Sequence, residues 1–354
     1  MRKILVALSG GVDSAAACVI LRQQGYEVGG ATMLLRDGGE QEAEDARRAA
    51  QALGIDFHCF DLRKEFCHII IGNFKEVYQQ GGTPNPCVLC NQKMKFGIFL
   101  QKALELGYDG IATGHYAQVD KVGDRTILRL ASDPAKDQTY MLWGLDQWQL
   151  SHTVFPLGAV CNKEETRRLA QEAGLELARK KDSQDICFVP DGDYLKFLTD
   201  GGLVPREGNF ITCEGKILGK HRGLEAYTVG QRRGLGIAFG QRAYVLGKRG
   251  SDVIIGEDAQ LFARRVLVEQ VNYIPFDTLR EPMEVTAKLR YSARTARALL
   301  LPTEQGCELI FEEPQRAITP GQSAVFYDGD KVIGGGIIVG SASENHLGGK
   351  ENEL

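Results

Sequence analysis

Two cysteines three positions apart stand in a loop that is rich in proline. The segment PNPCVLC covers residues 84–90 and carries its thiols at Cys87 and Cys90, and a helical pattern follows from Asn91 to Leu106. A helix N-terminus lowers the pKa of a nearby thiol, and the thiolate is the form of cysteine that acts as a nucleophile. We therefore expect a reactive thiolate in this loop.

The same C-x-x-C spacing also occurs in one half of a zinc site. No second C-x-x-C and no pair of histidines follows at the spacing of a zinc finger. The sequence therefore favours a reactive thiol over structural zinc, which stays as the alternative.

A second cysteine with polar surroundings is Cys187, which follows the segment KKDSQDI. The cations Lys180 and Lys181 favour its thiolate form, whereas Asp182 and Asp185 oppose it. The other six cysteines stand among apolar residues or in strand patterns, and nine cysteines in 354 residues are too scattered for a disulfide scaffold. We expect these six to be small core residues: Cys18, Cys59, Cys67, Cys161, Cys213 and Cys307.

A glycine-rich loop, SGGVDS at residues 9–14, lies between a short apolar run and a helical pattern. Backbone N–H groups of such a loop and the positive end of the helix can converge on phosphate oxygens. The loop lacks the lysine of the Walker motif, which leaves Asp13 as a ligand, direct or through water, for magnesium on pyrophosphate. It resembles the loop of enzymes that cleave ATP between the α and β phosphates.

The elements around this loop alternate between strand and helix. Strands are predicted first, then helices: strands at Lys3–Leu8, Tyr26–Leu34, Ile55–Phe60 and Gly110–Thr113; helices at Ser14–Gln24 and Glu40–Leu53. Such alternation predicts an α/β fold with a doubly wound parallel sheet, which binds ligands at the carboxyl ends of its strands.

The pattern changes near residue 197, where helices become rare and short strands alternate with glycine-containing turns. Alternating runs from about residue 261, with a hairpin turn at Asp328-Gly329, predict a small antiparallel β-barrel. We predict a catalytic domain at 1–197, a β-rich central domain at 198–260, a C-terminal barrel domain at 261–345 and a polar tail at 346–354.

The formal net charge of −4 excludes a basic field over the whole molecule, so any RNA contact must be local. Lys216 to Arg249 is such a local basic stretch, or else an ordinary solvated face. No apolar run approaches the roughly 20 residues of a membrane span, and the apolar run Ile4 to Leu8 is too short for a signal peptide. We expect a cytoplasmic protein without membrane partners.

Eight motifs, in the same order along the chain, make the sequence resemble the tRNA-specific 2-thiouridylase family over nearly its whole length. They are SGGVDS at 9–14, TPNPxxxCNxxxKF at 83–96, ATGHY at 112–116, KDQTY at 136–140, KKDSxxICF at 180–188, YTVGQRRGLG at 227–236, LRYSA at 289–293 and AITPGQSAVFY at 317–327. The resemblance implies a PP-loop domain of the adenine nucleotide alpha hydrolase type.

The resemblance also implies a sulfurtransferase reaction and a role for each matching residue. ATP adenylates the C2 oxygen of the wobble uridine in the tRNAs for Lys, Glu and Gln, and a persulfide on Cys187 supplies the sulfur that replaces it. Cys90 is the implied nucleophile and forms a disulfide with Cys187 when sulfur leaves. A cysteine desulfurase or a relay protein is the implied sulfur donor.

The implied binding residues fall into three groups. ATP meets Ala7, Leu8, Ser9, Gly10, Gly11, Val12, Asp13, Ser14, Met33 and Gly114; the target base meets Asn85, Pro86 and Cys87; other parts of the tRNA meet His115, Lys136, Asp137, Gln138, Arg290, Tyr291 and Gln322.

One position departs from the family pattern, because Cys87 stands where the best-described members carry aspartate. Three thiols, those of Cys87, Cys90 and Cys187, also suit a [4Fe-4S] cluster with one open iron site. This cluster is the alternative to the persulfide mechanism. Two further alternatives are a PP-loop synthetase that adenylates a carboxylate, and a nonenzymatic tRNA-binding protein.

Overall fold

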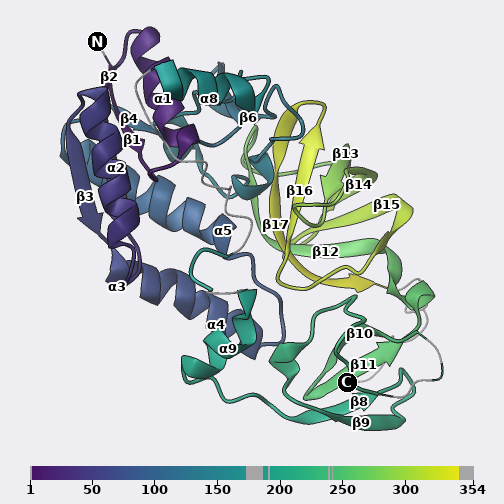
Figure 1. Cartoon of the computed structure of the whole chain (residues 1–354). Coiled ribbons are helices and arrows are strands. Elements are labelled where there is room, and N and C mark those ends of the chain that lie inside the picture. Colours follow the sequence, from purple (N-terminus) through teal and green to yellow (C-terminus); the bar gives the residue numbers. More distant parts are fainter. Residues whose placement is uncertain (1, 173–185, 190–191, 238–239, 241, 343–354) are drawn as a thin grey trace.

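A computed structural model of the chain describes residues 2–172, 186–189, 192–237, 240 and 242–342. Its N-terminal part is built on a five-stranded parallel sheet with the order β3-β2-β1-β4-β7 (Figure 1). The strands are β1 (Lys3–Ala7), β2 (Glu27–Leu34), β3 (Phe57–Asp61), β4 (Gly110–Ala112) and β7 (Thr153–Val154). The predicted parallel sheet is confirmed, and its order reverses direction at β1, because β2 and β4 flank that strand.

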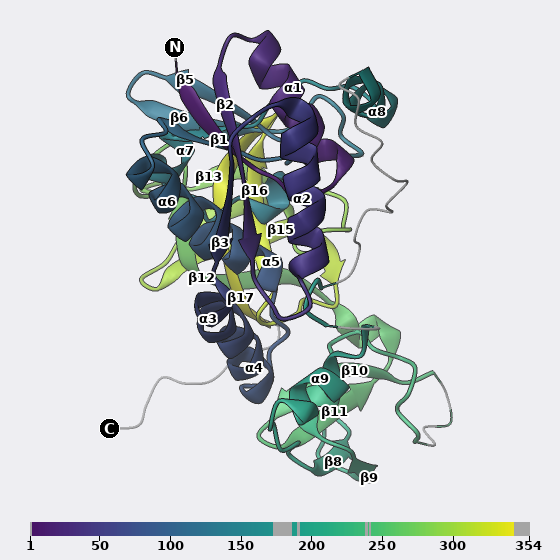
Figure 2. The ribbon, with the colours of Figure 1, turned by 60° about the vertical axis from the view of Figure 1, so that its left-hand side comes forward.

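Helices cover both faces of this sheet because successive apolar side chains of β1 point to opposite faces. Ile4 and Val6 pack with the buried faces of α1 (Val12–Gln23) and α2 (Glu40–Leu53). Leu5 points to the other face, where it packs in the core that Phe96, Phe99 and Leu100 form. Figure 2 shows the sheet between these two layers.

The helical segment after the proline-rich loop is continuous but changes its winding. It runs through α5 (Pro86–Leu89), the π-helix η2 (Cys90–Phe99) and α6 (Leu100–Glu105). Pro86 occupies the first helical position, which suits proline because that position needs no N–H donor. The helix predicted from Asn91 therefore begins five residues earlier, and both cysteines lie inside it rather than in front of it.

The remaining helices of the N-terminal part lie outside the parallel sheet. They are α3 (Arg63–Phe66), the π-helix η1 (Cys67–Ile71), α4 (Gly72–Gln79), the 3-10 helix η3 (Thr139–Met141), α7 (Gln147–Ser151), α8 (Lys163–Glu172) and α9 (Tyr194–Asp200). Phe66, Phe74 and Phe188 make edge-to-face contacts, so the segment around residue 188 packs on α3 and α4.

The central part is a small four-stranded sheet of order β10-β11-β8-β9, which appears as a separate lobe in Figure 1. Its strands are β8 (Gly208–Ile211), β9 (Ile217–His221), β10 (Tyr244–Arg249) and β11 (Asp252–Gly256), and the 3-10 helix η5 (Leu224–Ala226) lies beside them. Phe210, Tyr227 and Val245 form its core.

The C-terminal part is a six-stranded antiparallel barrel, closed because β12 pairs with both β15 and β17. A 3-10 helix, η6 (Asp258–Leu261), leads into strands β12 (Phe262–Tyr273), β13 (Met283–Lys288), β14 (Ala296–Pro302), β15 (Gly306–Arg316), β16 (Ser323–Asp328) and β17 (Lys331–Ala342). The predicted barrel is confirmed, and its β16–β17 hairpin turn lies one residue later than predicted, at Gly329-Asp330, because Asp328 pairs with Lys331.

A hairpin of β5 (Gln118–Val122) and β6 (Arg125–Arg129) ties the two larger parts together. Arg129 of β6 pairs with Lys331 of β17, so the hairpin extends the sheet of the barrel. Trp143 and Val325 of β16 belong to one hydrophobic core that also includes Leu5 of β1. The barrel is therefore packed directly on the domain that carries the glycine-rich loop.

Two of the six cysteines expected in the core, Cys18 and Cys307, are buried. The expectation is wrong for Cys59, Cys67, Cys161 and Cys213, which are exposed. Cys59 lies on the edge strand β3, and Cys213 lies in the turn between β8 and β9. No helix in the described part of the chain is long and apolar enough to cross a membrane.

Candidate active site

The glycine-rich loop joins β1 to α1 in a conformation that only glycine adopts easily. Gly10 has φ +68°, and a Cβ atom there would stand 2.7 Å from Cβ of Asp45. The loop closes on itself, because the N–H of Ser9 donates to Oγ of Ser14 at 3.2 Å and that hydroxyl donates to the carbonyl of Gly11 at 3.1 Å. No side chain caps the N-terminus of α1, so its first N–H groups can receive an anion.

The loop after β4 closes against this helix end. A Cβ atom at Gly114 would lie 3.0 Å from the backbone nitrogen of Ser14, so the two loops touch through backbone. The carboxylate of Asp13 accepts a hydrogen bond of 3.1 Å from the hydroxyl of Tyr116. Met33, near the end of β2, is half-buried beside Phe60. The residues predicted to bind ATP therefore line the carboxyl ends of β1, β2 and β4, where the strand order reverses.

The three candidate thiols lie close enough to influence one another's ionisation. A negative charge on Cys187 raises the pKa of both Cys87 and Cys90. Cys90 is half-buried in the same apolar cluster as Ile186 and Phe188, so the segment around Cys187 packs against the helix that carries Cys90. All three are free thiols in this structure.

The prediction of a thiolate at the helix start is wrong for this state of the protein. Burial raises the pKa of Cys90 to about 11, and the neighbouring thiols raise it further against the opposing effect of Lys95. Burial also raises the pKa of Cys87 and of Cys187, although both side chains keep contact with solvent. Desolvation outweighs the helix end here because Cys90 is packed among apolar side chains.

Lys95, a half-buried cation at the centre of this site, is not among the residues predicted from the sequence. It lowers the pKa of Cys87, Cys90 and Cys187 alike. A π-helix forms hydrogen bonds between residues five apart, so Lys95 follows Cys90 by one turn of η2. Lys95 is the lysine of the motif TPNPxxxCNxxxKF, but the motif alone does not show that the π-helix places Lys95 one turn after Cys90.

Two of the polar residues predicted to contact tRNA, His115 and Asp137, interact with neighbouring residues of their own chain segment. Nδ1 of His115 lies 2.7 Å from the hydroxyl of Thr113, and burial lowers the pKa of His115 well below its ordinary value, so the ring is neutral. The carboxylate of Asp137 accepts hydrogen bonds from the N–H of Ala131 at 2.9 Å and from the hydroxyl of Thr139 at 2.6 Å. Burial raises the pKa of Asp137.

The other residues predicted to contact tRNA include Lys136, Gln138 and Tyr291, whose side chains differ in exposure to solvent. The amide oxygen of Gln138 accepts from the N–H of Tyr116 at 3.0 Å, and Lys136 is half-buried beside it. The exposed Tyr291 leaves 44% of its surface to solvent and lies with its ring 6.0 Å from that of Tyr140. A planar side chain that is open on one side can stack on a base.

The barrel side contacts the proline-rich loop through Gln322, in a segment that Arg290 also holds. The guanidinium of Arg290 donates to the hydroxyl of Thr319 at 2.6 Å, which fixes the loop before β16. The amide of Gln322 donates to the carbonyls of Thr83 and Pro84 at 3.0 and 3.2 Å. Asn85, Pro86 and Cys87 follow directly in the chain, so a barrel residue contacts the segment that carries the thiols.

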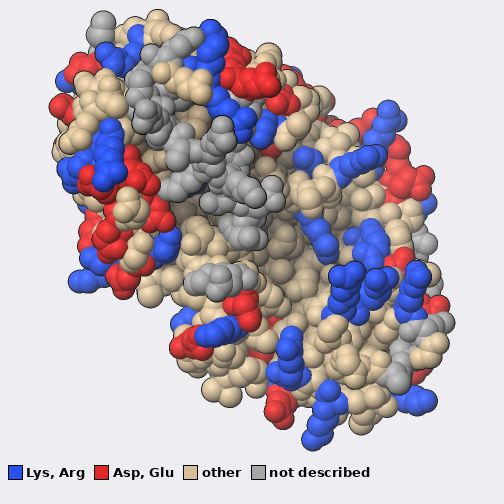
Figure 3. Space-filling view, in the orientation of Figure 1, with Lys and Arg blue, Asp and Glu red and all other residues tan. Residues whose placement is uncertain are grey.

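Charge on the surface is uneven. Figure 3 shows Lys and Arg gathered where the lobe of β8–β11 meets the barrel. In the basic stretch 216–249, Arg232 and Arg233 are exposed, whereas Nζ of Lys248 is buried beside Glu225, and burial lowers the pKa of Lys248 to about 8. Arg232 and Arg233 are therefore open to solvent, whereas the charged end of Lys248 is buried.

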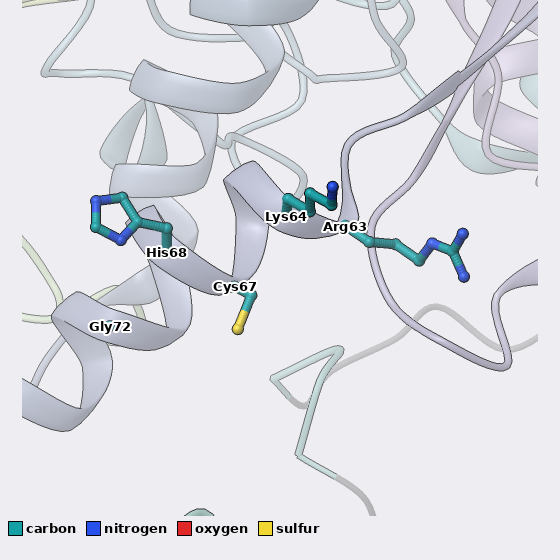
Figure 4. A pocket seen from close by; sticks show the side chains of 5 residues that line it. All are labelled: Arg63, Lys64, Cys67, His68 and Gly72. Atoms are coloured by element: carbon teal, nitrogen blue, oxygen red, sulfur yellow. The ribbon is translucent and has the colours of Figure 1, made fainter.

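An open depression on the outer side of α3, η1 and α4 is lined by Arg63, Lys64, Cys67, His68 and Gly72. In Figure 4 these side chains diverge, so no set of polar groups converges there on a ligand. We assign this depression no part in the chemistry.

Three family models match consecutive parts of the chain. A tRNA methyl transferase HUP domain matches residues 2–191, a tRNA methyl transferase PRC-barrel domain matches 196–256, and an aminomethyltransferase β-barrel domain matches 263–338.

Curated relatives match over nearly the full length. The tRNA-specific 2-thiouridylase MnmA 1 of Clostridium botulinum (strain Loch Maree / Type A3) is 45% identical over 95% of this chain and 99% of its own. The enzyme of the same name from Caldicellulosiruptor saccharolyticus is 45% identical over 95% and 98% of the two chains, and that of Halothermothrix orenii is 46% identical over 96% and 99%. The chain therefore belongs to the tRNA-specific 2-thiouridylase family.

Proposed function

We propose that this protein is a tRNA-specific 2-thiouridylase, which uses ATP to replace the C2 oxygen of a tRNA wobble uridine with sulfur. The observation that carries the proposal is the meeting of two chemistries at one edge of the sheet. The glycine-rich loop follows β1, and Cys90 and the neighbours of Cys187 pack in one cluster with Met33 and Leu35 at the end of the adjacent strand β2. In keeping with the family resemblance, we propose the tRNAs for Lys, Glu and Gln as the substrates.

ATP is needed because the C2 carbonyl of uridine is a poor electrophile with a strongly basic leaving group. Transfer of AMP to that oxygen converts it into a phosphate ester leaving group and releases pyrophosphate. The loop of Ser9 to Ser14 fits the pyrophosphate, since its helix N–H groups lack a side-chain cap. Asp13 at the start of α1 fits a magnesium ion, which would neutralise phosphate charge there.

Sulfur then arrives as a persulfide on Cys187, loaded by a donor protein. In one route its terminal sulfur attacks C2 and expels AMP, and the thiolate of Cys90 next attacks Sγ of Cys187. That step breaks the bond between the two sulfurs, frees 2-thiouridine and leaves a Cys90–Cys187 disulfide. In the other route Cys90 first releases the terminal sulfur as hydrosulfide, which then attacks C2. Both routes end in the same disulfide, which a two-electron reductant must reopen.

The target base must leave its stack to reach the thiols, at a cost of a few kcal/mol that is smaller in a single-stranded anticodon loop. We place the base at Asn85 to Cys87, where the proline-rich loop enters the helix. The rest of the tRNA would contact His115, Lys136 to Gln138, Arg290 and Tyr291, of which Tyr291 is the most open to stacking.

The iron–sulfur alternative requires three thiolates that converge on one metal cluster. Among the residues that the structure describes, no group of three or more Cys, His, Asp or Glu side chains is placed to hold a metal ion. We therefore derive no step through a cluster held by Cys87, Cys90 and Cys187. Anaerobic purification followed by assays for iron and acid-labile sulfide tests it separately.

The test of the proposed function is tRNA thiolation in vitro with ATP and a persulfide donor. Wild type should form 2-thiouridine, AMP and pyrophosphate, and Cys90→Ala and Cys187→Ala should form no 2-thiouridine. Cys213→Ala is the matched control, because that exposed thiol lies in a turn of the central sheet. A synthetase that adenylates carboxylates would leave the uridine unchanged in wild type, and a nonenzymatic tRNA-binding protein would bind without consuming ATP.

A further inference from the structure

The loop that leads to the thiols is held by the barrel rather than by its own domain. The amide nitrogen of Gln322 donates one hydrogen bond to the carbonyl of Thr83 at 3.0 Å and another to that of Pro84 at 3.2 Å. The N–H of Thr83 donates back to the carbonyl of Pro320 at 2.9 Å. Three hydrogen bonds therefore join two chain segments more than 230 positions apart.

Backbone packing reinforces these bonds at Gly321. Its φ of +89° is a conformation that favours glycine, and a Cβ atom there would lie 2.9 Å from both the nitrogen and the oxygen of Thr83. The two backbones are therefore in direct contact, and any side chain at position 321 would push the proline-rich loop away.

A displacement of Thr83 would pass to the thiols because the chain between them is stiff. Pro84 and Pro86 are buried, and proline fixes φ near −65°. Pro86 begins the helix that carries Cys87 and Cys90. The position of Thr83 and Pro84 thus sets the start of that helix.

We infer that Gln322 is a positioning residue for the reaction: its amide, together with Pro320 and Gly321, holds the loop 83–85 and so places the thiol helix at the sheet edge. We call the segment 319–322 the barrel clasp. The catalytic consequence rests on the proposed function, whereas the effect on the reactivity of Cys90 does not. The clasp differs from the family-implied role of Gln322 as a tRNA contact, because both amide hydrogens are engaged by the loop before any tRNA is bound.

The test compares variants of the clasp in the full-length protein. Gln322→Ala removes both donors, and Gln322→Glu keeps the shape but sets a carboxylate against two carbonyls. Gly321→Ala places a Cβ atom against the backbone of Thr83 and keeps the side chain of Gln322. Gly329→Ala is the matched control, because Gly329 in the β16–β17 turn also has positive φ, at +59°, but no atom lies within 4 Å of the place that its Cβ would take.

The first measurement is alkylation of Cys90 by iodoacetamide without tRNA or ATP, followed by mass spectrometry of the tryptic peptide that ends at Lys93. A released loop should expose Cys90 and raise its alkylation rate by roughly threefold to tenfold, the equivalent of losing one or two ordinary hydrogen bonds. All three clasp variants should show this rise, and Gly329→Ala should match wild type. Unchanged alkylation in the three variants would overturn the clasp, even if the protein proved not to thiolate tRNA.

The second measurement separates positioning from tRNA binding. At saturating tRNA, the single-turnover thiolation rate of Gln322→Ala should fall about tenfold, while its dissociation constant for tRNA stays within twofold of wild type. Gly321→Ala should show the same split. A weakened tRNA affinity with a normal rate at saturation would assign Gln322 to tRNA contact and would contradict the inference.

Discussion

At the residue scale, each thiol of the site is harder to ionise than a free cysteine. Burial raises the pKa of Cys90 to about 11, whereas sulfur transfer needs its thiolate. Lys95 is the cation that acts on all three thiols, and no hydrogen bond or ion pair engages it among the residues that the structure describes. We infer that Lys95 compensates in part for the desolvation of the thiols.

Replacement of Lys95 by methionine should therefore raise the pKa of Cys90 still further. The sign follows because the ammonium favours the charged thiolate, so its loss favours the neutral thiol. Alkylation of Cys90 between pH 8 and 10 should be slower in Lys95→Met, and its pH profile should move to higher pH. Lys93→Met, an exposed lysine two positions away on the same helix, should leave the profile unchanged. Equal profiles for Lys95→Met and wild type would contradict this role.

At this scale the sequence indicates Cys87, Cys90 and Cys187 as candidate reactive thiols, because thiols beside prolines, lysines and a helix start are unusual, and the separate roles of Cys90 and Cys187 stay predictions that the family resemblance implies. It could not predict that burial raises the pKa of these thiols, because desolvation depends on Phe188 and other side chains from distant segments. The sequence also could not predict the role of Lys95, because the distance between Lys95 and Cys90 depends on the π-helix.

At the scale of elements, the glycine-rich loop and the loop after β4 are in backbone contact. The strand, glycine loop and helix were predictable, because each has a local pattern. The contact of Gly114 with Ser14 was not, because β4 pairs with β1 across more than 100 positions of the chain. The strands β5 and β6 were also missed, since β6 is tied to the barrel by its pairing with β17.

Gly114→Ala tests this contact. The new Cβ would stand 3.0 Å from the nitrogen of Ser14 and would press on the start of α1. We expect ATP affinity to fall by about tenfold, since a shifted helix end no longer directs its N–H groups at the phosphates. Gly247→Ala on β10 is the control, because no atom lies within 4 Å of a Cβ there. Isothermal titration of ATP measures the effect, and normal affinity in Gly114→Ala would separate this contact from nucleotide binding.

At the scale of the whole molecule, a net charge of −4 coexists with a local cationic surface. The sequence located the basic stretch but could not show which of its side chains are exposed. Lys248 is turned inward beside Glu225, whereas Arg232 and Arg233 face solvent. The barrel and the parallel sheet share one hydrophobic core through Trp143 and Val325, which no local pattern predicts. We infer that tRNA binds across the central lobe and the barrel.

Binding of tRNA should accordingly depend on salt. The double variant Arg232→Ala, Arg233→Ala should bind tRNA more weakly, and the slope of log affinity against log salt should fall by about 1 for each lost phosphate contact. Arg47→Ala with Arg48→Ala removes the same charge from the exposed side of α2, far from the lobe in Figure 1, and should bind as wild type. Equal slopes for the two double variants would place the tRNA elsewhere.

In the proposed reaction, one turnover joins Cys90 to Cys187. The most direct measurement is mass spectrometry of the protein after a single turnover with tRNA, ATP and a Cys187 persulfide, without reductant. We expect one Cys90–Cys187 disulfide for each 2-thiouridine formed, in an enzyme that has no such disulfide beforehand. A full yield of 2-thiouridine with both thiols still free would contradict it.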